Sequence, residues 1–403
     1  MKTKFDIIVV GGGLVGLAAA FKIQQKKPNQ KILVLEKEDD LALHQSGRNS
    51  GVLHSGLYYQ PGSHKAENCV AGRRELVEFS QQYNINHDVC GKLVVATNKQ
   101  ELDVLPILLS RGKKNGLQNL QIIDKYEMKE IEPFVNGLSA IWVPETGIID
   151  YRAVAKKLAF LITQINNESQ ILTNTEVLDV KTNSEKSVVI TNREQFEGAN
   201  IVFCAGLFSD RLAKSDNIST NLKIVGFRGD YYTLTTEASH KVKNLIYPVP
   251  NPEFPFLGVH FTRMANGEIE CGPNAVFTFK REGYQKMAFS LRDTLDSLSY
   301  LGTWRLFKNH WRFGVNELVK ASSKKVFLNH LKKLIPSLTM QDIVPGRSGV
   351  RAMALGKDGD IIDDFKIVVN GRNIHVLNAP SPAATACLSI GDTISNQFLK
   401  LIN

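Results

Sequence analysis

Several features are scarce in this 403-residue sequence, and each scarcity excludes a class of protein. The five cysteines, at positions 69, 90, 204, 271 and 387, are odd in number and form no C-x-x-C pair. This argues against a disulfide framework or a metal site and favours a reducing cytoplasm. No apolar run reaches the roughly 18 residues of a membrane-spanning helix. Glycines interrupt the N-terminal apolar stretch, so we expect no signal peptide.

The excess of positive charge is concentrated in one stretch. The net charge is +9, and residues 280–333 contain twelve Lys/Arg and four Asp/Glu, which leaves +8 there. Trp304, Phe307 and Trp311 within it fall on one face of a helix. This basic helical stretch, 283–335, could be a cap with solvated lysines or a surface that binds peripherally to the inner face of the cell membrane. No nucleic-acid module accompanies the charge, so we expect no nucleic-acid partner.

The N-terminal segment carries a dinucleotide-binding fingerprint. A buried-strand pattern over residues 5–10 leads into Gly11, Gly13 and Gly16, and helix-forming residues follow over 17–26. Gly11 would make the tight turn, Gly13 would admit a pyrophosphate, and Gly16 would let helix and strand pack closely. The helix N-terminus would offer amide donors to the phosphates. The other cofactor-binding residues expected in this unit are Leu14, Val15, Glu36 and Lys37.

The second strand of this unit, residues 31–36, ends in a carboxylate. Glu36 lies 25 residues after Gly11, near the spacing at which an acidic side chain binds ribose hydroxyls. A carboxylate at this position also disfavours the 2′-phosphate of NADP. The ordered series of strand, glycine motif, helix, strand and acid therefore predicts a bound dinucleotide.

Later segments return to the same domain and indicate which dinucleotide it is. Residues 201–206 form a second strand that ends in small residues, and residues 176–180 resemble the strand that borders an adenine. The run 378–385 enters a final helix over 386–399, whose N-terminus could face the pyrimidine end of a flavin. An NAD dehydrogenase has no use for these returns, so we expect FAD. The cofactor contacts expected here are Val177, Ala205, Gly206, Pro382, Ala383, Ala384 and Thr385.

The segment 46–59 combines glycines, an arginine, hydroxyls, a histidine and two tyrosines. Arg48, Asn49 and Ser50 suit the cofactor, with Arg48 near its phosphates. His54 can move a proton at neutral pH. The adjacent tyrosines at 58 and 59 alternate faces if the chain is extended, so only one would meet a substrate, and we assign Tyr59.

No repeat, low-complexity segment or linker divides the chain, so two domains must interleave. We expect an α/β protein with a Rossmann-like FAD-binding domain and a substrate domain built on an antiparallel sheet. The FAD domain is expected at 1–85, 150–225 and 340–403, and the substrate domain at 86–149 and 226–339. Strands are expected at 91–96, 231–234, 256–263 and 268–272, with a hairpin turn at Asn266-Gly267 and a helix over 151–165.

Long motifs make the chain similar to a known family. They lie at 46–59, 256–263, 272–275, 351–352 with 363–365, and 378–385. These segments resemble the D-amino-acid oxidase-like superfamily, and within it the L-2-hydroxyglutarate oxidase/dehydrogenase family. The resemblance implies oxidation of L-2-hydroxyglutarate to 2-oxoglutarate on FAD, with electrons passed to a membrane quinone or to oxygen. It runs from residue 11 to about 391, but nothing in the basic stretch matches residue by residue.

The resemblance also implies roles for particular side chains. Related glycerol-3-phosphate oxidases share the Ser50 and His54 arrangement, in which the histidine is the base. Arg351 resembles the arginine that binds the substrate carboxylate. His260 and Arg263 could bind the second carboxylate. Each arginine could instead form an ordinary ion pair, and His54 could simply pack against the flavin.

Other functions remain open from the sequence. Glycerol 3-phosphate or another L-2-hydroxy acid would suit the same positive clamp. An amino-acid oxidase is less favoured, because amine oxidation does not need the base that His54 supplies. A flavin-binding protein without turnover would not need the base and the arginines together.

Overall fold

The first strand and helix follow the fingerprint closely. The computed structural model describes residues 3–183, 185–250 and 258–402. Strand β1 (Thr3–Val10) runs into helix α1 (Leu14–Lys26), and β2 (Ile32–Leu35) returns beside β1 in parallel. Ile7, Ile8 and Val9 are fully buried because both faces of the sheet are covered.

These strands belong to an eight-stranded sheet whose centre is parallel. The parallel strands lie in the order β9-β2-β1-β12-β20, and antiparallel strands extend the sheet beyond β12 and β20. The other members of the sheet are β9 (Gln170–Leu172), β10 (Val177–Thr182), β11 (Ser187–Thr191), β12 (Gln195–Phe203), β19 (Lys366–Asn370) and β20 (Asn373–Asn378).

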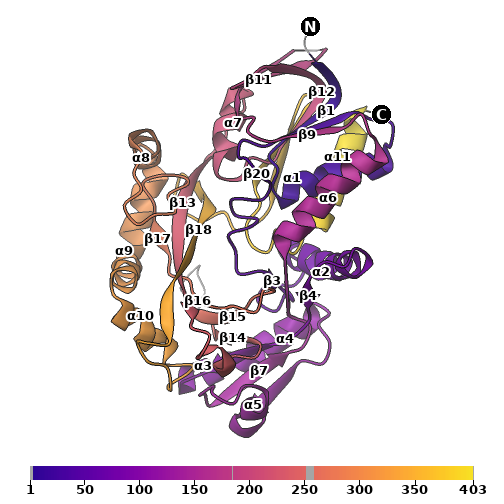
Figure 1. The fold of residues 1–403 in the computed structure, drawn as a ribbon. Helices are drawn as coiled ribbons and strands as arrows, with labels where there is room; N and C mark the ends of the chain where they lie inside the picture. The colour runs from indigo at the N-terminus through magenta and orange to yellow at the C-terminus, as the bar shows by residue number, and fades with distance from the viewer. Residues whose placement is uncertain (1–2, 184, 251–257, 403) are drawn as a thin grey trace.

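Three helices cover one face of this sheet, as Figure 1 shows. Helix α1 packs against α6 (Tyr151–Ile165) and α11 (Cys387–Ile402), and α2 (His64–Gln82) packs against α11. Asp150 begins α6 by accepting bonds from the amides of residues 152 and 153. Helix α7 (Ser209–Ser215) contacts β10 and β20. Segments from the beginning, middle and end of the chain therefore share one core.

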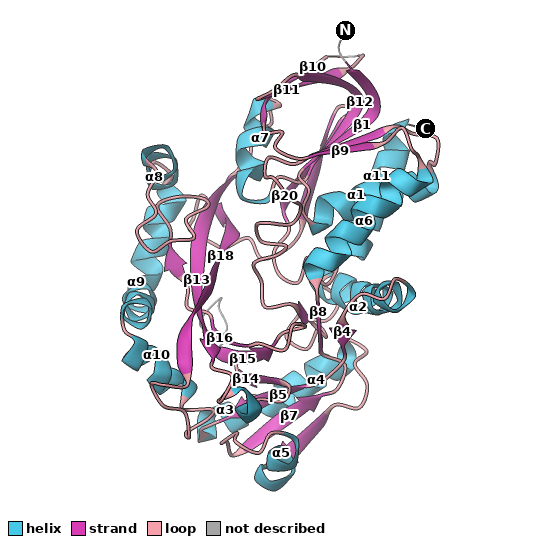
Figure 2. Cartoon of the chain, viewed as in Figure 1, coloured by secondary structure: helices cyan, strands magenta, loops and turns pink. Residues whose placement is uncertain are grey.

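A nine-stranded sheet forms the second half of the molecule (Figure 2). All its strands pair antiparallel except β5 and β14. The expected hairpin turn is present, with Gly267 at φ 87°; residues 256 and 257 of that expected strand lie outside the described residues. The strands are β5 (Lys92–Ala96), β6 (Gln121–Asp124), β7 (Ser139–Val143), β13 (Leu222–Leu234), β14 (Leu245–Pro248), β15 (His260–Arg263), β16 (Ile269–Gly272), β17 (Val276–Phe277) and β18 (Ile343–Gly356).

Two long strands connect the halves. β13 and β18 pair from Leu222↔Gly356 to Leu234↔Ile343, so both belong to the nine-stranded sheet along their whole length. The expected boundary at residue 340 assigned β18 to the FAD domain, and the boundaries themselves stay a prediction. A three-stranded sheet of β3 (Val52–Leu53), β8 (Gly147–Ile149) and β4 (His87–Asp88) lies near the site.

The basic stretch folds into three helices along the outer side of β13 and β18 (Figure 1). These are α8 (Leu291–Leu298), α9 (Leu301–Ser322) and α10 (Lys324–Leu331). Leu306 on α9 and Phe327 on α10 are buried, but Trp304 and Trp311 on α9 are 55% and 58% exposed. No helix within the described part of the chain is long and apolar enough to cross a membrane.

The remaining helices lie around the far strands of the nine-stranded sheet. They are α3 (Lys99–Leu102), α4 (Leu105–Lys114) and α5 (Lys125–Ile131), with short 3₁₀ turns at Gly206–Phe208 and Ser239–Lys241. The architecture confirms the expected α/β class with a Rossmann-like half and a second half built on a mainly antiparallel sheet.

Candidate functional site

The three fingerprint glycines have different surroundings. Gly11 adopts φ 113°, and a side chain there would meet the carbonyl of Cys204. A Cβ on Gly16 would meet the carbonyl of Gly11, so this glycine allows helix and strand to pack closely. A Cβ on Gly13 would meet only the Ser46 hydroxyl, at 3.0 Å. Gly13 therefore borders space that a ligand could enter, as the pyrophosphate role requires.

The start of α1 is arranged to receive an anion. Gly13 is the N-cap and supplies no side-chain cap, and the first turn holds no acidic residue. The Leu14 amide donates to Ser46 Oγ at 3.0 Å. The first turn continues through Val15 and Gly16, and amides at such an end, with the helix dipole, stabilise phosphate.

Glu36 lies at the end of β2 and is nearly buried. Its carboxylate accepts bonds from the amides of Gly12 at 2.8 Å and Glu38 at 3.0 Å. Each oxygen keeps a lone pair for a ribose hydroxyl. The glycine turn, the helix end and this carboxylate together fit the adenosine diphosphate half of FAD.

Other predicted cofactor residues lie at neighbouring strand ends. Val177 begins β10, and Ala205 and Gly206 follow β12, where the Cys204 amide donates to the carbonyl of Val10 at 2.8 Å. Lys37 forms an ion pair with Glu282 and lies 4.5 Å from the centroid of the Phe208 ring. These contacts leave its predicted cofactor role untested.

Side chains of the segment 46–59 form hydrogen bonds with the backbone of that segment and of the residues just before it. Asn49 Nδ2 donates to the carbonyls of Gln45 and Ser46 at 2.9 and 2.8 Å, and its Oδ1 accepts from the Gly51 amide at 2.9 Å. Arg48 Nε donates to the Leu43 carbonyl at 3.0 Å, and its guanidinium stacks on Tyr284 at 3.9 Å. These contacts place Arg48 beside the loop that leads into α8, and its phosphate role stays a prediction.

Arg347 was not identified from the sequence, although it fixes the same segment. Its guanidinium donates to the carbonyls of Gly47 at 3.1 Å and Asn49 at 2.6 Å and forms an ion pair with Glu270 on β16. It therefore connects the segment 46–59 to the nine-stranded sheet. No local pattern marks it, because its partners are about 80 and 300 residues away.

The C-terminal turn holds His54 in place. Thr385 Oγ1 accepts a bond from the His54 amide at 3.1 Å and lies 2.9 Å from Tyr151 Oη. The Ala386 amide donates to the Pro382 carbonyl at 3.0 Å, so the residues 382–386, which include Ala383 and Ala384, form a compact turn before α11. Thr385 therefore brings His54 and Tyr151 together, as expected if segments near both ends of the chain bind FAD.

The His54 side chain lies among cationic groups. The residue is half-buried, and its side chain forms no hydrogen bond within the described residues. Loss of water contact lowers its pKa to about 3, and the charges of Lys92, His260, Arg351 and Lys65 lower it further. The imidazole is therefore neutral at ordinary pH and free to accept a proton.

Strand pairing separates the two residues assigned to the second carboxylate. In β15, Thr262 shares a face with His260, whereas Arg263 shares the other face with Phe261. His260 stacks on Tyr247 with centroids 3.9 Å apart, and burial lowers its pKa to about 3. Arg263 instead forms an ion pair with Asp88. The structure does not bring Arg263 to the His54 group, and its assignment as a clamp loses its support.

Ser50, Arg351 and the tyrosine pair complete the group. Ser50 is buried. Burial raises the pKa of Tyr231, and the charge of Arg351 and a hydrogen bond with Ser50 partly offset that rise. Tyr59 interacts with Ser381, and the centroid of its ring lies 5.6 Å from Lys65 Nζ. Tyr58, which was not selected, faces Lys92 instead: Lys92 Nζ lies 4.5 Å from the centroid of its ring.

Lys92, on β5, is the second residue that the sequence did not reveal. It is 1% exposed, and burial lowers its pKa to about 7. The expected strand over 91–96 included it, but an isolated lysine in an apolar strand gives no signal of function. Its role depends on what the folded chain places around it.

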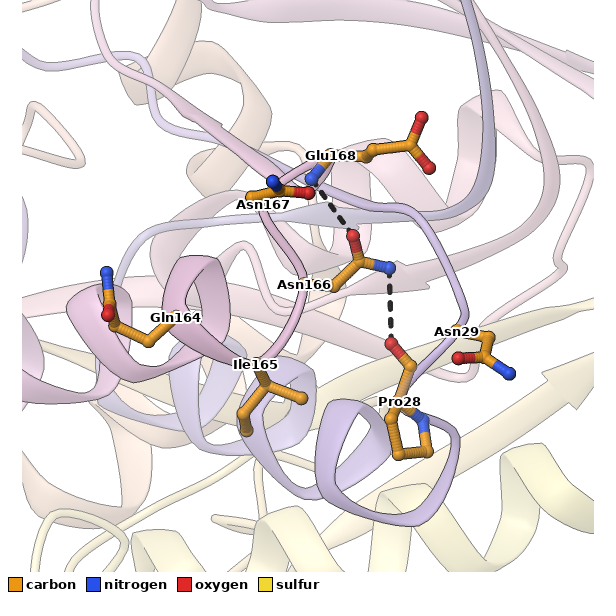
Figure 3. Close-up of a pocket in the computed structure, with 7 residues that line it drawn as sticks. All are labelled: Pro28, Asn29, Gln164, Ile165, Asn166, Asn167 and Glu168. Atoms are coloured by element: carbon orange, nitrogen blue, oxygen red, sulfur yellow. Dashed lines mark hydrogen bonds between the residues drawn. The ribbon is translucent and has the colours of Figure 1, made fainter.

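Two other features lie apart from this group. Figure 3 shows a hollow lined by Pro28, Asn29 and residues 164–168, in which Asn166 Nδ2 donates to the Pro28 carbonyl at 3.1 Å. This hollow contains none of the predicted site residues. Glu38, His44 and Glu282 also lie close together, but Lys37 pairs with both carboxylates.

Comparison with known proteins agrees with this geometry. The model of the "FAD dependent oxidoreductase" family, DAO, matches residues 6–397. The L-2-hydroxyglutarate dehydrogenase of Indibacter alkaliphilus is 47% identical over 98% of this chain and 99% of its own length. The mitochondrial L-2-hydroxyglutarate dehydrogenase of Bos taurus is 43% identical over 98% of this chain and 89% of its own.

A solved structure shares the fold. The L-α-glycerophosphate oxidase of Mycoplasma pneumoniae with FAD bound superposes with a TM-score of 0.79 at 24% identity, covering 98% of this chain and 95% of that one. The chain therefore belongs to the L-2-hydroxyglutarate oxidase/dehydrogenase family of FAD-dependent oxidoreductases, which act on CH–OH groups.

Proposed function

We propose that this protein oxidises L-2-hydroxyglutarate to 2-oxoglutarate. The observation that carries the proposal is the position of the His54 imidazole, which makes no side-chain hydrogen bond among the described residues, close to Lys92 and Arg351. An alcohol beside a carboxylate needs a proton acceptor and a cationic clamp, and this group supplies both. The names of the similar proteins support the same substrate.

Bound FAD supplies the acceptor for the hydride that leaves C2 of the substrate. His54 takes the hydroxyl proton, so the carbon becomes a carbonyl and both electrons leave with the hydride. A pKa of about 3 would make His54 a weak base. An anionic substrate would offset the surrounding positive charges and raise that pKa, so the base strengthens when substrate is bound.

Arg351 is proposed to bind the carboxylate next to the reacting carbon. Its charge acts on His54, His260 and Tyr231, which places it within the group. A planar guanidinium can hold a carboxylate through two parallel bonds and so fix the C2 atom. Ser50 lies beside Tyr231 and would border the flavin.

The test is anaerobic flavin bleaching. L-2-hydroxyglutarate should bleach the flavin, while the D-isomer and glycerol 3-phosphate should not. His54→Gln should keep FAD but slow bleaching by about 10²- to 10⁴-fold. Bleaching by glycerol 3-phosphate alone would reassign the substrate. Bleaching by none of the three would overturn the proposal.

We also propose that electrons leave at an anionic membrane surface, to a quinone, with oxygen as the less productive acceptor. The exposed apolar side chains support this: ten large ones between residues 287 and 319 are open to solvent. They are Met287, Phe289, Leu291, Leu295, Leu301, Trp304, Trp311, Val315, Leu318 and Val319. A basic, aromatic surface of this kind suits anionic lipid. Quinone analogues should therefore reoxidise the reduced protein faster than oxygen does.

A further inference from the structure

Lys92 differs from the other buried cations of the described chain. Five lysines and arginines there are buried. Four of them have carboxylate partners: Lys65 with Asp363, Arg73 with Glu145, Arg228 with Asp230, and Arg281 with Asp210. Within the described residues Lys92 has none, and its Nζ lies 4.5 Å from the ring centroid of Tyr58 and 5.0 Å from that of Tyr247. A buried cation without an anion is costly, so it indicates a partner that arrives from outside.

Strand pairing directs Lys92 to the face where the His54 group lies. Lys92 pairs with Leu245 on β14, and Leu245 pairs with Thr262 on β15. Side chains at these positions share one face of the sheet, together with Tyr247 and His260. The charge of Lys92 lowers the pKa of both His54 and His260, so the ammonium is close to the group.

A second donor lies beside it. The hydroxyl of Tyr58 is buried and has no hydrogen-bond partner among the described residues. A carboxylate in contact with Lys92 could accept a bond from this hydroxyl as well. Two buried donors without an acceptor on one side of the site are complementary to an anionic group.

We infer that Lys92 Nζ, assisted by Tyr58 Oη, binds the second carboxylate of the substrate and selects dicarboxylic 2-hydroxy acids over their monocarboxylic analogues. This inference rests on the proposed function and assigns a residue to its specificity. Arg351 then holds the carboxylate beside the reacting carbon, and Lys92 the distal one. A desolvated charge pair of this kind rejects an analogue that lacks the charge, because the lysine is left unpaired.

The pH dependence follows from the surrounding groups. Those that face Lys92 or act on its site are His54, Tyr58, Lys65, Cys69, Tyr231, Tyr247, His260, Glu270 and Arg351, and Glu270 is paired with Arg347. Burial keeps both histidines neutral above about pH 4 and raises the pKa of Cys69 to about 12. Lys92 has a pKa of about 7 and must be charged to bind a carboxylate. The value of kcat/KM should therefore fall as pH rises through about 7.

The experiment compares L-2-hydroxyglutarate with L-2-hydroxyvalerate, in which a methyl group replaces the distal carboxylate. Lys92→Met in the holoenzyme should lower kcat/KM for the dicarboxylate by at least about 30-fold, mainly through KM. It should change kcat/KM for L-2-hydroxyvalerate by less than about 3-fold. It should also abolish the fall in kcat/KM for L-2-hydroxyglutarate as pH rises through about 7. Lys129→Met, at an exposed position on α5, is the control and should leave kcat/KM unchanged for both substrates.

Glutarate, which cannot be oxidised, gives a readout independent of turnover through the flavin spectrum. It should bind the wild type and bind Lys92→Met at least about 30-fold more weakly. If Lys92→Met loses FAD, Tyr58→Phe replaces it, with an expected selective loss of about 5-fold from one hydrogen bond.

An unchanged preference between the two acids in the variant would overturn the inference while leaving the proposed function intact. If the wild type does not oxidise L-2-hydroxyglutarate but binds glutarate through Lys92, the carboxylate subsite is supported and the proposed substrate is wrong. Equal glutarate binding by the wild type and Lys92→Met would overturn the subsite.

Discussion

At the scale of single residues, the site depends on electrostatic surroundings. His54, His260 and Lys92 are ordinary residue types whose pKa values all lie below their usual range, to about 3, 3 and 7. Burial is the largest cause for each, and the shared positive charge adds to it for the histidines. The group as a whole therefore favours an anionic ligand before any contact with it is made.

Lys92 should also reduce the stability of the ligand-free protein. Its pKa is about 7 when folded and 10.5 as an ordinary lysine, so the charged form is disfavoured by folding. The cost is fully present below pH 7 and fades as pH rises toward 10.5. Lys92→Met should therefore raise Tm by a few degrees at pH 6 and hardly at all near pH 10.

Calorimetry of substrate-free holoenzyme at the two pH values would measure this, with Lys129→Met as control. A lower Tm for Lys92→Met at pH 6 would mean that packing of the lysine stem outweighs the unpaired charge. Excess glutarate should make the Tm of the wild type higher than that of Lys92→Met, because only the wild type gains a charge pair between Lys92 and a glutarate carboxylate.

At the scale of elements, different glycines of the turn between β1 and α1 serve the stability of the fold and the binding of the cofactor. Gly16→Ala would force a Cβ against the Gly11 carbonyl and should destabilise the protein by about 2 kcal/mol or more. Gly13→Ala has only the Ser46 hydroxyl nearby, so it should fold normally but bind FAD weakly. Chemical denaturation and FAD titration of the two variants would distinguish the effects. Equal destabilisation of both, or unchanged FAD affinity in Gly13→Ala, would contradict this division.

Elements were predicted well where their signals are local. The helix over 151–165 has the predicted bounds, because Asp150 caps its start and its apolar positions recur at helical spacing. The strand expected at 231–234 is the end of the thirteen-residue β13. Its earlier part is defined by pairing with β18, more than a hundred residues away, which no local pattern reports.

At the scale of the whole molecule, helices α8 to α10 lie along the outer side of β13 and β18 (Figure 1), and exposed apolar and basic side chains occur along them. Binding to anionic vesicles should therefore occur and should weaken with salt. Changing Lys324, Lys325, Lys332 and Lys333 to Gln should weaken it further, as should Trp304→Ala with Trp311→Ala.

Vesicle sedimentation would measure this binding. A control with the same change in net charge replaces four exposed lysines elsewhere, Lys99, Lys113, Lys114 and Lys129, with Gln. If both charge variants lose binding equally, net charge rather than this surface drives it. Absence of binding by the wild type would exclude the membrane surface.

The sequence by itself determined the α/β class, the FAD fingerprint, the family and the segment that carries His54. Each of these was recognised from short motifs, such as Gly11 to Gly16, in which local spacing already encodes the geometry. Only the tertiary structure decided which charges are paired. It turned Arg263 toward Asp88, connected Arg347 to Glu270, exposed Trp304 and left Lys92 with no carboxylate partner among the described residues. A charged side chain acquires its partner from strands and helices that meet only on folding, and its pKa and chemistry follow from that meeting.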